Sequence, residues 1–410
     1  MRIVHFNEHL NWTGGVETYL LHLLPALESQ GMTNTYVFAR GDNNLLPRTV
    51  QLPEICQIGR RAEHNGYKKT LAILEDLRPE IIHIHRIYNL GVMRACLDFG
   101  PTVVTCHDYL YLCPAGSFFH RRTRTVCQRK AGLGCLVVTL LRHCMTLRPR
   151  YAVGYLRRVK QFHAWRDRFA FVLCPSDSVR DRLLKQDFPS PRTVTLPYFC
   201  PIKPRSAPRP LLGQPSVLFM GRTRPIKGFD VFIRALGLVP NAKGIIVGDA
   251  NENTQKVIRN IAREAGCEHR LEIRPWAARD EIPSLFEQAT LFVFPSICPE
   301  TLGIVGLEAM AHGVPVVASD IGGVRQWLRH GINGLLVPPK NVEALAAAIR
   351  DLLASPARLM EMGRAGIETI HQSFLIQDHV TRLLRLYHAA VGFWKKDLIT
   401  PANYTGYDHK

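Results

Sequence analysis

Two glutamates stand eight residues apart in an otherwise apolar segment, "FPSICPETLGIVGLEAMAHG" (residues 294–313). Carboxylates are rarely buried without a partner, because removing a charge from water is costly. Pro299 places Glu300 in a loop, and Gly303 then begins a helix on which Glu308 lies about one and a half turns in. The first N–H groups of a helix can receive an anion. The two acids can therefore bind hydroxyls on either side of a phosphate, which is the layout of a nucleotide sugar.

Each glutamate also has a simpler interpretation that involves no ligand. Glu308 could form a buried ion pair with an arginine. Glu300 could be an exposed acid near the first turn of a helix, where the helix dipole favours negative charge.

Two cations occupy the loop "RTRPIKG", which follows the strand-like segment "SVLFMG". Arg222 is always charged and Lys227 supplies a compact ammonium, so the pair suits a diphosphate without a metal. Preorganised cations of this kind can stabilise charge on a leaving group. The alternative is a solvated polar loop. The Gly14–Gly15 pair and His107 give weaker signals, since paired glycines often form only a turn and His107 with its following acid could be a capped helix start.

Strand-like segments alternate with helix-like segments in both halves of the chain. In the first half the strand-like segments are 2–6, 34–39, 80–85, 102–108, 170–176 and 193–199. In the second half they are 216–221, 243–249, 270–275, 290–296, 314–320 and 333–339. Alternation of this type predicts parallel sheets covered on both faces. The fold class is therefore α/β, with two Rossmann-like doubly wound domains.

A proline-rich stretch, residues 198–215, separates the two halves and predicts a domain boundary. We expect an N-terminal acceptor-side domain over 1–203 and a donor domain over 204–380. A C-terminal helix and tail over 381–410 is expected to return to the first domain. Ligands of open α/β sheets bind beyond the carboxyl ends of the strands. If the two sheets face each other, one shared cleft collects Gly15, His107, Arg222, Lys227, Glu300 and Gly303.

The segment "PSICPETLGIVGLEAMAHGVPVVASDIGG" closely resembles the signature of GT4-type retaining glycosyltransferases, which have the GT-B fold. The segment "MGRTRPIKGFDVFIRAL" resembles the Gly-Arg and Lys-Gly loop of the same family, while "GGVE" and "CHD" are weaker marks in the first half. The resemblance implies that Glu300 holds hydroxyls of the donor sugar and Glu308 holds the ribose. It also implies that Arg222 and Lys227 bind the diphosphate and that backbone groups near Gly303 and Ile304 contact the phosphates. In the first half, Gly15 would let a loop approach the phosphates closely, and His107 would contact the transferred sugar.

The implied activity is transfer of a hexose, with retention, from a UDP- or GDP-linked donor to a hydroxyl of the acceptor. That acceptor is a glycan, a lipid-linked compound or a polysaccharide precursor, and neither cofactor nor metal is expected. Two alternatives remain open. A sugar-nucleotide epimerase or a phosphorylase could use the same fold, and a basic protein could bind nucleic acid.

The positive charge is concentrated between His120 and Arg168, where 13 Lys and Arg face one acid and supply +12 of the net +18. Such a block implies an anionic partner, either an anionic or lipid-linked glycan acceptor or an anionic membrane surface. The alternative is a solvated face of long basic side chains without a partner. We expect Arg157, Arg158 and Lys160 among its surface cations. Nucleic acid is disfavoured, because the block lacks a recognition motif and has few aromatic residues.

No apolar stretch reaches the ~20 residues of a membrane-spanning helix, and the start of the chain does not read as a signal peptide. We therefore expect a cytoplasmic protein, peripheral at the inner face of the membrane. The 11 cysteines are scattered in apolar contexts, which favours reduced thiols. Cys113, Cys127, Cys135 and Cys144 cluster with two histidines, but their wide spacing makes a metal site the weaker alternative.

Overall fold

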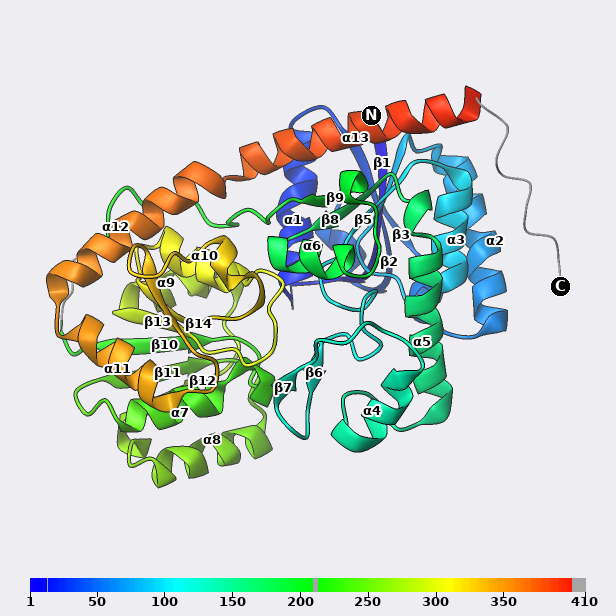
Figure 1. The fold of residues 1–410 in the computed structure, drawn as a ribbon. Helices are drawn as coiled ribbons and strands as arrows, with labels where there is room; N and C mark the ends of the chain where they lie inside the picture. The colour runs from blue at the N-terminus through cyan, green and yellow to red at the C-terminus, as the bar shows by residue number, and fades with distance from the viewer. Residues whose placement is uncertain (13, 209–212, 400–410) are drawn as a thin grey trace. The chain divides into compact units, whose positions relative to one another are not determined.

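A computed structural model describes residues 1–12, 14–208 and 213–399. The chain forms two compact units, both discontinuous in sequence. The first unit contains residues 1–116 and 129–196 together with the C-terminal segment from Gln377, and the second contains 117–128 and 197–376. Figure 1 follows the chain from blue at the N-terminus to red at the last helix.

The first unit is built on a seven-stranded parallel sheet of order β3-β2-β1-β4-β5-β8-β9. Its strands are β1 (Arg2–Leu10), β2 (Thr33–Gly41), β3 (Thr49–Gln51), β4 (Ile81–Ile84), β5 (Thr102–Thr105), β8 (Phe171–Cys174) and β9 (Thr193–Thr195). The chain runs outward from β1 through β2 to β3, and then returns to β4 on the other side of β1. The direction of winding therefore reverses between β1 and β4, which is where open α/β sheets bind ligands.

Helices flank this sheet in the first unit, and most of them bury an apolar stripe, because apolar side chains must be removed from water. They are α1 (Gly15–Glu28), α2 (Arg60–Leu77), α3 (Leu90–Phe99), α4 (Gly134–Arg142), α5 (Pro149–Ala164), α6 (Asp177–Leu184) and α13 (Ile376–Ile399). On α13 the buried side chains are Val380, Leu383, Tyr387 and Ala390. The Tyr387 hydroxyl lies 2.6 Å from Nδ1 of His83 on β4, so the last helix joins the core of the first unit.

The second unit repeats the plan with a six-stranded parallel sheet of order β12-β11-β10-β13-β14-β15. Its strands are β10 (Ser216–Met220), β11 (Lys243–Val247), β12 (Leu271–Arg274), β13 (Leu291–Phe294), β14 (Val316–Ser319) and β15 (Gly334–Val337). Its helices are α7 (Phe229–Gly237), α8 (Glu252–Glu264), α9 (Ile282–Gln288), α10 (Ile304–Ala311), α11 (Val342–Leu353) and α12 (Pro356–Ser373). Here the winding reverses between β10 and β13.

A short antiparallel hairpin, β6 (Phe119–His120) and β7 (Thr125–Val126), belongs to the second unit. Arg124 Nη2 lies 2.8 Å from Asp230 Oδ2 on α7, and Lys340 Nζ donates to the Arg124 carbonyl at 2.7 Å. These contacts attach the hairpin to its unit.

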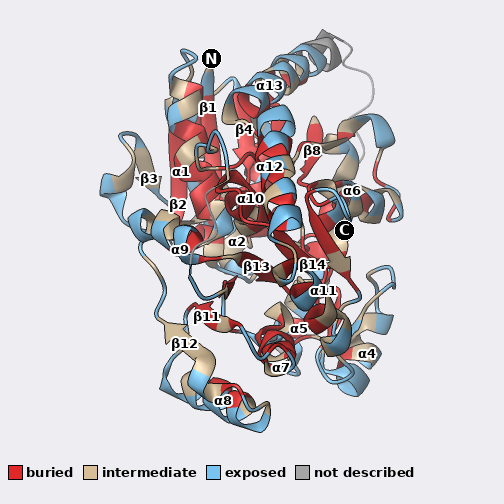
Figure 2. Cartoon of the chain, turned by 90° about the vertical axis from the view of Figure 1, so that its left-hand side faces the viewer, coloured by how far each residue is buried: buried red, intermediate tan, exposed pale blue. Residues whose placement is uncertain are grey.

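The central strands of both sheets are buried on both faces, and Figure 2 shows them in red. Two parallel sheets with flanking helices confirm the predicted α/β fold class. All twelve predicted strand segments contain a strand, whereas β3, β6 and β7 were not predicted, because two or three residues carry no readable alternation. Among the described residues, no helix combines the length and apolar character needed to cross a bilayer.

Candidate active site

The predicted donor residues of the second unit follow two adjacent strands, β10 and β13, at the point where the winding reverses. Lys227 ends a short 3-10 turn after β10, and Glu300 lies in the loop between β13 and α10. Nζ of Lys227 lies 2.7 Å from Oε1 and 3.0 Å from Oε2 of Glu300. Ser296 also donates its hydroxyl to Glu300. The structure therefore brings together two residues that are 73 positions apart in sequence.

This ion pair keeps the Lys227 ammonium charged although its surroundings are largely buried. The Glu300 residue is 9% exposed. Burial opposes the charge of Lys227, but the neighbouring Glu300 carboxylate outweighs it and raises the pKa of Lys227 above its usual value. Burial raises the pKa of the Cys298 thiol to about 12. Lys227 is therefore a cation at neutral pH and Cys298 is a neutral thiol.

Glycines hold the loops of this pair in place by allowing close backbone contacts. Gly228 follows Lys227 with φ of 75°, and a Cβ there would lie 1.9 Å from the Pro295 carbonyl oxygen. Gly322 has φ of 60°, and a Cβ there would lie 2.3 Å from the Glu300 carbonyl oxygen. The next residue, Gly323, donates its N–H to the same oxygen at 2.7 Å. Only glycine fits such left-handed positions without strain.

The indole of Trp327 holds the start of α10 in place. Gly303 caps the helix with φ of 101°, and Ile304 is its first residue, as the sequence predicted. Trp327 donates Nε1–H to the Leu302 carbonyl at 2.8 Å, and its ring packs against Gly306 so closely that a Cβ there would lie 2.3 Å from Cη2. The N–H groups of the first turn are consequently presented from a rigid support, next to Glu300 in the chain.

Glu308 forms the ion pair that was the alternative for this residue. Arg279 Nη1 lies 2.8 Å from Oε1 of Glu308, whose side chain is 5% exposed. Burial raises the pKa of the Glu308 carboxyl, although Arg279 opposes the shift. Nη2 of Arg279 is buried and has no hydrogen-bond partner among the described residues. One donor of this guanidinium is therefore still available beside Glu308.

Arg222, in contrast, is exposed just beyond β10 and is not bonded to Glu300 in the way Lys227 is. Next to it, Thr223 donates its N–H and its hydroxyl to Asp249 Oδ1 at 2.7 and 3.0 Å. Asp249 follows β11, so a third strand end contributes to the same edge of the sheet. The loop is anchored at Thr223, whereas Arg222 is exposed.

In the first unit His107 follows β5 and is the end of a chain of buried histidines. His107 Nε2 lies 2.8 Å from His85 Nδ1, His85 Nε2 lies 3.1 Å from His5 Nδ1, and His5 Nε2 lies 3.2 Å from Asn34 Oδ1. Burial lowers the pKa of His5 to about 4 and that of His107 to about 3, with Arg86 and His379 adding to the shift of His107. It also holds the pKa of His85 well below its usual value.

The direction of these hydrogen bonds follows from Asn34. Its Nδ2 donates to the Leu24 carbonyl at 3.1 Å, so the atom facing His5 is the carbonyl oxygen, which can only accept. His5 must then carry its proton on Nε2 and accept from His85 at Nδ1. His85 in turn accepts from His107 at Nδ1. Since all three rings are neutral, the proton of His107 is on Nε2 and its Nδ1 carries a lone pair.

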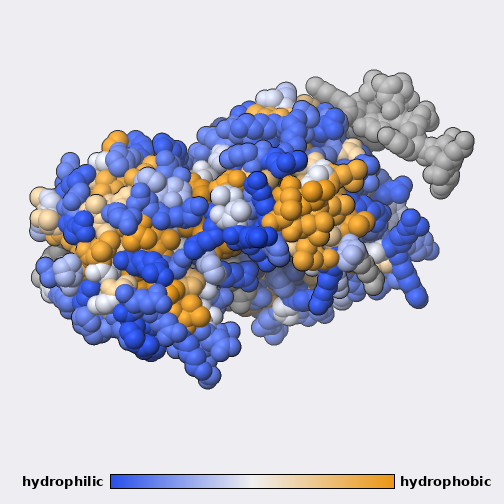
Figure 3. Space-filling model, turned by 60° about the horizontal axis from the view of Figure 1, so that its bottom comes forward, coloured by the Kyte–Doolittle hydropathy of each residue, from blue (hydrophilic) through white to orange (hydrophobic). Residues whose placement is uncertain are grey.

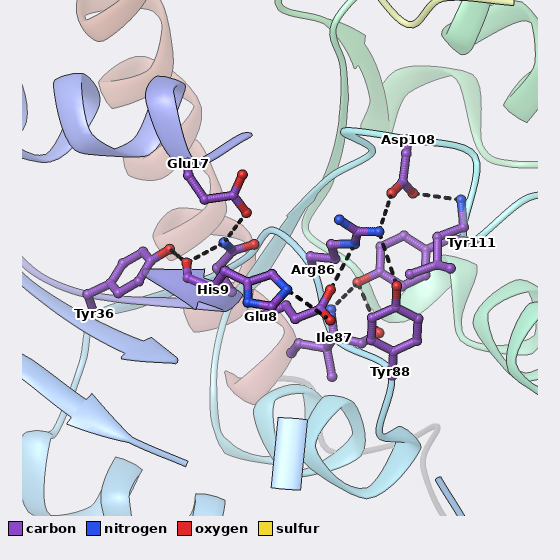
Figure 4. A network of polar contacts seen from close by, with 11 residues as sticks. Glu8, His9, Glu17, Tyr36, Arg86, Ile87, Tyr88, Asp108 and Tyr111 are labelled. Atoms are coloured by element: carbon purple, nitrogen blue, oxygen red, sulfur yellow. Dashed lines mark hydrogen bonds and ion pairs between the residues drawn. The ribbon is translucent and has the colours of Figure 1, made fainter. Parts of the chain in front are cut away.

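An ionic network lies beside this row of hydrogen-bonded histidines, at the ends of β1, β4 and β5 (Figure 4). Arg86 Nε is 3.3 Å from Glu8 Oε2, and Arg86 Nη2 is 3.4 Å from Asp108 Oδ2 and 3.1 Å from the Tyr88 hydroxyl. Burial opposes the charge of Arg86, but Asp108, Tyr88 and Glu8 together raise its pKa. Gly15, by comparison, is exposed at the first position of α1.

Sequence reasoning did not single out several residues of these two sites: Glu8, Arg86, Arg279 and the partners of His107. Arg86 follows "EIIHIH", so the rule that polar residues at strand ends face the ligand edge could have found it. His83 pairs with His5 in the register of β4 and β1, but a lone strand histidine gives no such signal. All 11 cysteines are thiols rather than disulfides.

Two family models match the two halves of the chain. Residues 205–369 match the model for glycosyl transferases group 1, and residues 13–199 match the model for glycosyltransferase family 4. The chain belongs to the group 1, or GT4-type, glycosyltransferases. D-inositol 3-phosphate glycosyltransferase from Mycolicibacterium paratuberculosis is 33% identical over 196 residues, 46% of this chain and 44% of that protein. The protein of the same name from Thermobispora bispora is 32% identical over 189 residues, 42% of this chain and 44% of that protein. The chain thus spans under half the length of these curated relatives.

Solved structures resemble the whole chain. Sucrose-phosphate synthase from Thermosynechococcus elongatus has a TM-score of 0.72 at 20% identity, covering 96% of this chain and 99% of that one. Anabaena HepE in complex with UDP-glucose has a TM-score of 0.70 at 16% identity, covering 94% and 98%. These similarities confirm the GT-B fold expected from the sequence.

Proposed function

We propose that this chain is a retaining glycosyltransferase that moves a hexose from a UDP-linked donor to a hydroxyl of an anionic acceptor. The observation that carries the proposal is the bonding of Lys227 to Glu300 at the reversal of the second sheet, directly before the N-terminus of α10. A cation, a carboxylate and free helix N–H groups are the groups that a nucleotide sugar requires. A UDP-linked donor is chosen over a GDP-linked one because HepE binds UDP-glucose.

In this proposal the cations act on the leaving group. As the bond between sugar and diphosphate breaks, negative charge grows on the diphosphate oxygens. Arg222 and Lys227 lie on the loop that would receive these oxygens, and preorganised charges stabilise such a transition state without reorganisation. The N–H groups at Gly303 and Ile304 supply further donors at the positive end of α10.

The carboxylates act on the hydroxyls of the donor. Glu300 can accept hydrogen bonds from the sugar while it keeps its bond to Lys227, since each carboxylate has about four lone-pair sites. Glu308 would accept from the ribose, with Arg279 holding the carboxylate in place. For the first unit the proposal keeps the roles that the family resemblance implies, a close approach of the phosphates at Gly15 and a contact of His107 with the sugar.

The acceptor is the less specified partner. The curated relatives are named for D-inositol 3-phosphate, which would suit a basic protein as an anionic polyol. A lipid-linked glycan would suit the same charge. Both classes present a hydroxyl and an anionic group, so the experiment below includes both.

The test is a calorimetric titration with UDP and GDP, followed by incubation with UDP-sugars and either inositol phosphate or a lipid-linked glycan. We expect UDP to bind, and we expect the product to keep the anomeric configuration of the donor sugar by NMR. EDTA should leave transfer unchanged, because side-chain cations rather than a metal neutralise the diphosphate. GDP binding without UDP binding would contradict the donor assignment. An epimerised donor with no transferred sugar would replace the proposal with an epimerase.

A further inference from the structure

Helix α4 of the first unit presents apolar side chains to solvent. Leu133, immediately before the helix, is 83% exposed, and Val137, Leu140 and Leu141 are 58, 67 and 63% exposed. Spacings of three and four residues place these side chains on one side of the helix. Thr139, on the other side, is buried and donates to the Cys135 carbonyl at 2.7 Å. The helix therefore turns its polar anchor inward and its leucines outward, the reverse of an ordinary surface helix.

The apolar surface continues into the start of α5. Leu147, Tyr151 and Val153 are 53, 46 and 55% exposed. Figure 3 shows a contiguous orange patch in the region of α4 on the face that it presents. Contiguous exposed apolar patches mark a binding surface for a protein or a membrane rather than ordinary surface.

The charge around this patch has one sign. From Arg129 to Lys160 there are eight Lys and Arg and no Asp or Glu. Arg129, Arg142 and Arg148 are exposed at the ends of the apolar segment. The Arg129 guanidinium lies against α4, since a Cβ on Gly134 would be 3.2 Å from its Nη2.

One cation expected on this surface, Arg158, is buried, which corrects the sequence analysis, and a second, Arg157, is exposed but ion-paired. Arg158 is only 2% exposed, donates to the Leu110 carbonyl and lies over the rings of Tyr88 and Tyr155. Arg157 pairs with Glu63 through both terminal nitrogens at 2.7 and 2.8 Å. Exposed positive charge near the leucines comes from Arg129, Arg142 and Arg148.

We propose that α4 and its flanking arginines are a docking surface for an anionic lipid bilayer. The leucines would enter the boundary between headgroups and acyl chains, and the arginines would contact phosphate groups, as amphipathic interfacial helices do. The proposal rests on the proposed function for its purpose, because a lipid-linked acceptor would then reach the first unit at the membrane surface.

The charges favour a bilayer over a second copy of the chain. A symmetric dimer through α4 would bring two acid-free arginine clusters together, and like charges at close range repel. An anionic leaflet instead offers negative charge around an apolar interior. Leucines and arginines thus find complementary partners at the same time.

The experiment is flotation of the full chain with vesicles of phosphatidylcholine, with and without phosphatidylglycerol. We expect binding that requires phosphatidylglycerol and is weakened at high salt. The variant Leu140→Gln with Leu141→Gln should bind at least tenfold more weakly at unchanged charge. The matched control, Leu238→Gln with Ile332→Gln, removes two exposed apolar side chains of the second unit, 46 and 52% exposed, and should bind as the wild type does.

A charge variant, Arg142→Gln with Arg148→Gln, should lose the response to phosphatidylglycerol while its melting temperature stays unchanged. Equal vesicle binding by the leucine variant and the wild type would overturn the proposal. So would a wild-type dimer by light scattering that the leucine variant abolishes, because a second copy would then cover the patch. UDP titration of the same variants separates the two proposals, since intact UDP binding without vesicle binding refutes only the docking surface.

Discussion

Lys227 and Glu300 are joined by two hydrogen bonds, at 2.7 and 3.0 Å, across the point where the second sheet reverses its winding. One residue follows β10 and the other follows β13, so neither loop can move without affecting the other. The pair also keeps a cation and an anion ready before any ligand arrives. Site preorganisation of this kind lowers the cost of charge development during reaction.

Removing either partner should reduce transfer strongly. For Glu300→Gln and Lys227→Ala we expect turnover to fall about a hundredfold, or about 3 kcal/mol of transition-state stabilisation. Steady-state kinetics with a UDP-sugar measures the effect, and far-UV circular dichroism should remain native.

The matched control is the Arg205–Glu287 ion pair of the same unit, whose atoms are 3.3 Å apart and exposed. Exposed pairs contribute about 0–1 kcal/mol, so Glu287→Gln should retain activity and stability. Near-normal turnover of Glu300→Gln would remove this residue from the proposed site.

The histidine chain predicts a specific tautomer for His107. In a ¹⁵N NMR spectrum of the histidine side chains, its Nε2 should be protonated and its Nδ1 should not. Asn34→Leu removes the acceptor that directs the chain, so the tautomers of His5, His85 and His107 should become mixed and turnover should fall. Asn34→Asp keeps an acceptor oxygen and should restore the single tautomer. A protonated Nδ1 of His107 in the wild type would show that the assigned direction is wrong.

The same buried histidines should make the fold sensitive to acid. An unfolded histidine takes up a proton below about pH 6.5. In the folded protein the pKa of His5 is lowered to about 4 and that of His107 to about 3, so both stay neutral until the pH is much lower. The unfolded chain then binds more protons, so the free energy of unfolding falls as pH falls. Each histidine contributes about 1.4 kcal/mol per pH unit in this window.

Urea titrations across this pH window measure that slope. His5→Asn should reduce it by about one proton. His371→Asn, at an exposed position, should leave it unchanged. A slope equal in the wild type and His5→Asn would mean that His5 is protonated in the folded state.

Substitution of Gly306 tests how closely the position of α10 depends on its packing against Trp327. An added methyl would lie 2.3 Å from the Trp327 ring, which holds the Leu302 carbonyl ahead of the helix. Gly306→Ala should therefore lower the free energy of unfolding by about 1–3 kcal/mol through overpacking and should also weaken UDP binding. Chemical denaturation and calorimetry measure the two effects.

Gly392→Ala is the control for this substitution. Gly392 lies on α13 with open space around the position of an added Cβ, and alanine favours a helix by about 0.5–1 kcal/mol over glycine. Unchanged stability of Gly306→Ala would show that the indole can shift at little cost.

The sequence predicted the sheets well because a parallel strand buried on both faces is a continuous apolar run, as in Ile81–Ile84. It predicted Gly303 as the start of α10 because proline and glycine punctuate the loop. It could not show that Lys227 is held by Glu300, since side-chain distances across 73 residues depend on tertiary packing.

Other features escaped prediction for physical reasons. Arg158 read as one of several surface cations, but its guanidinium is buried over two tyrosine rings, and charge counting cannot separate the two cases. The sequence analysis did not single out the outward leucines of α4. Direction is decided by what the helix packs on, which periodicity alone does not reveal.

The place of α13 has a consequence for the synthesis of the protein. Its Tyr387 bonds to His83, which is made some three hundred residues earlier. A ribosome therefore completes the whole second unit before it delivers the residues that finish the first. A chain interrupted before α13 would therefore contain every residue of the second unit but lack the segment that completes the first.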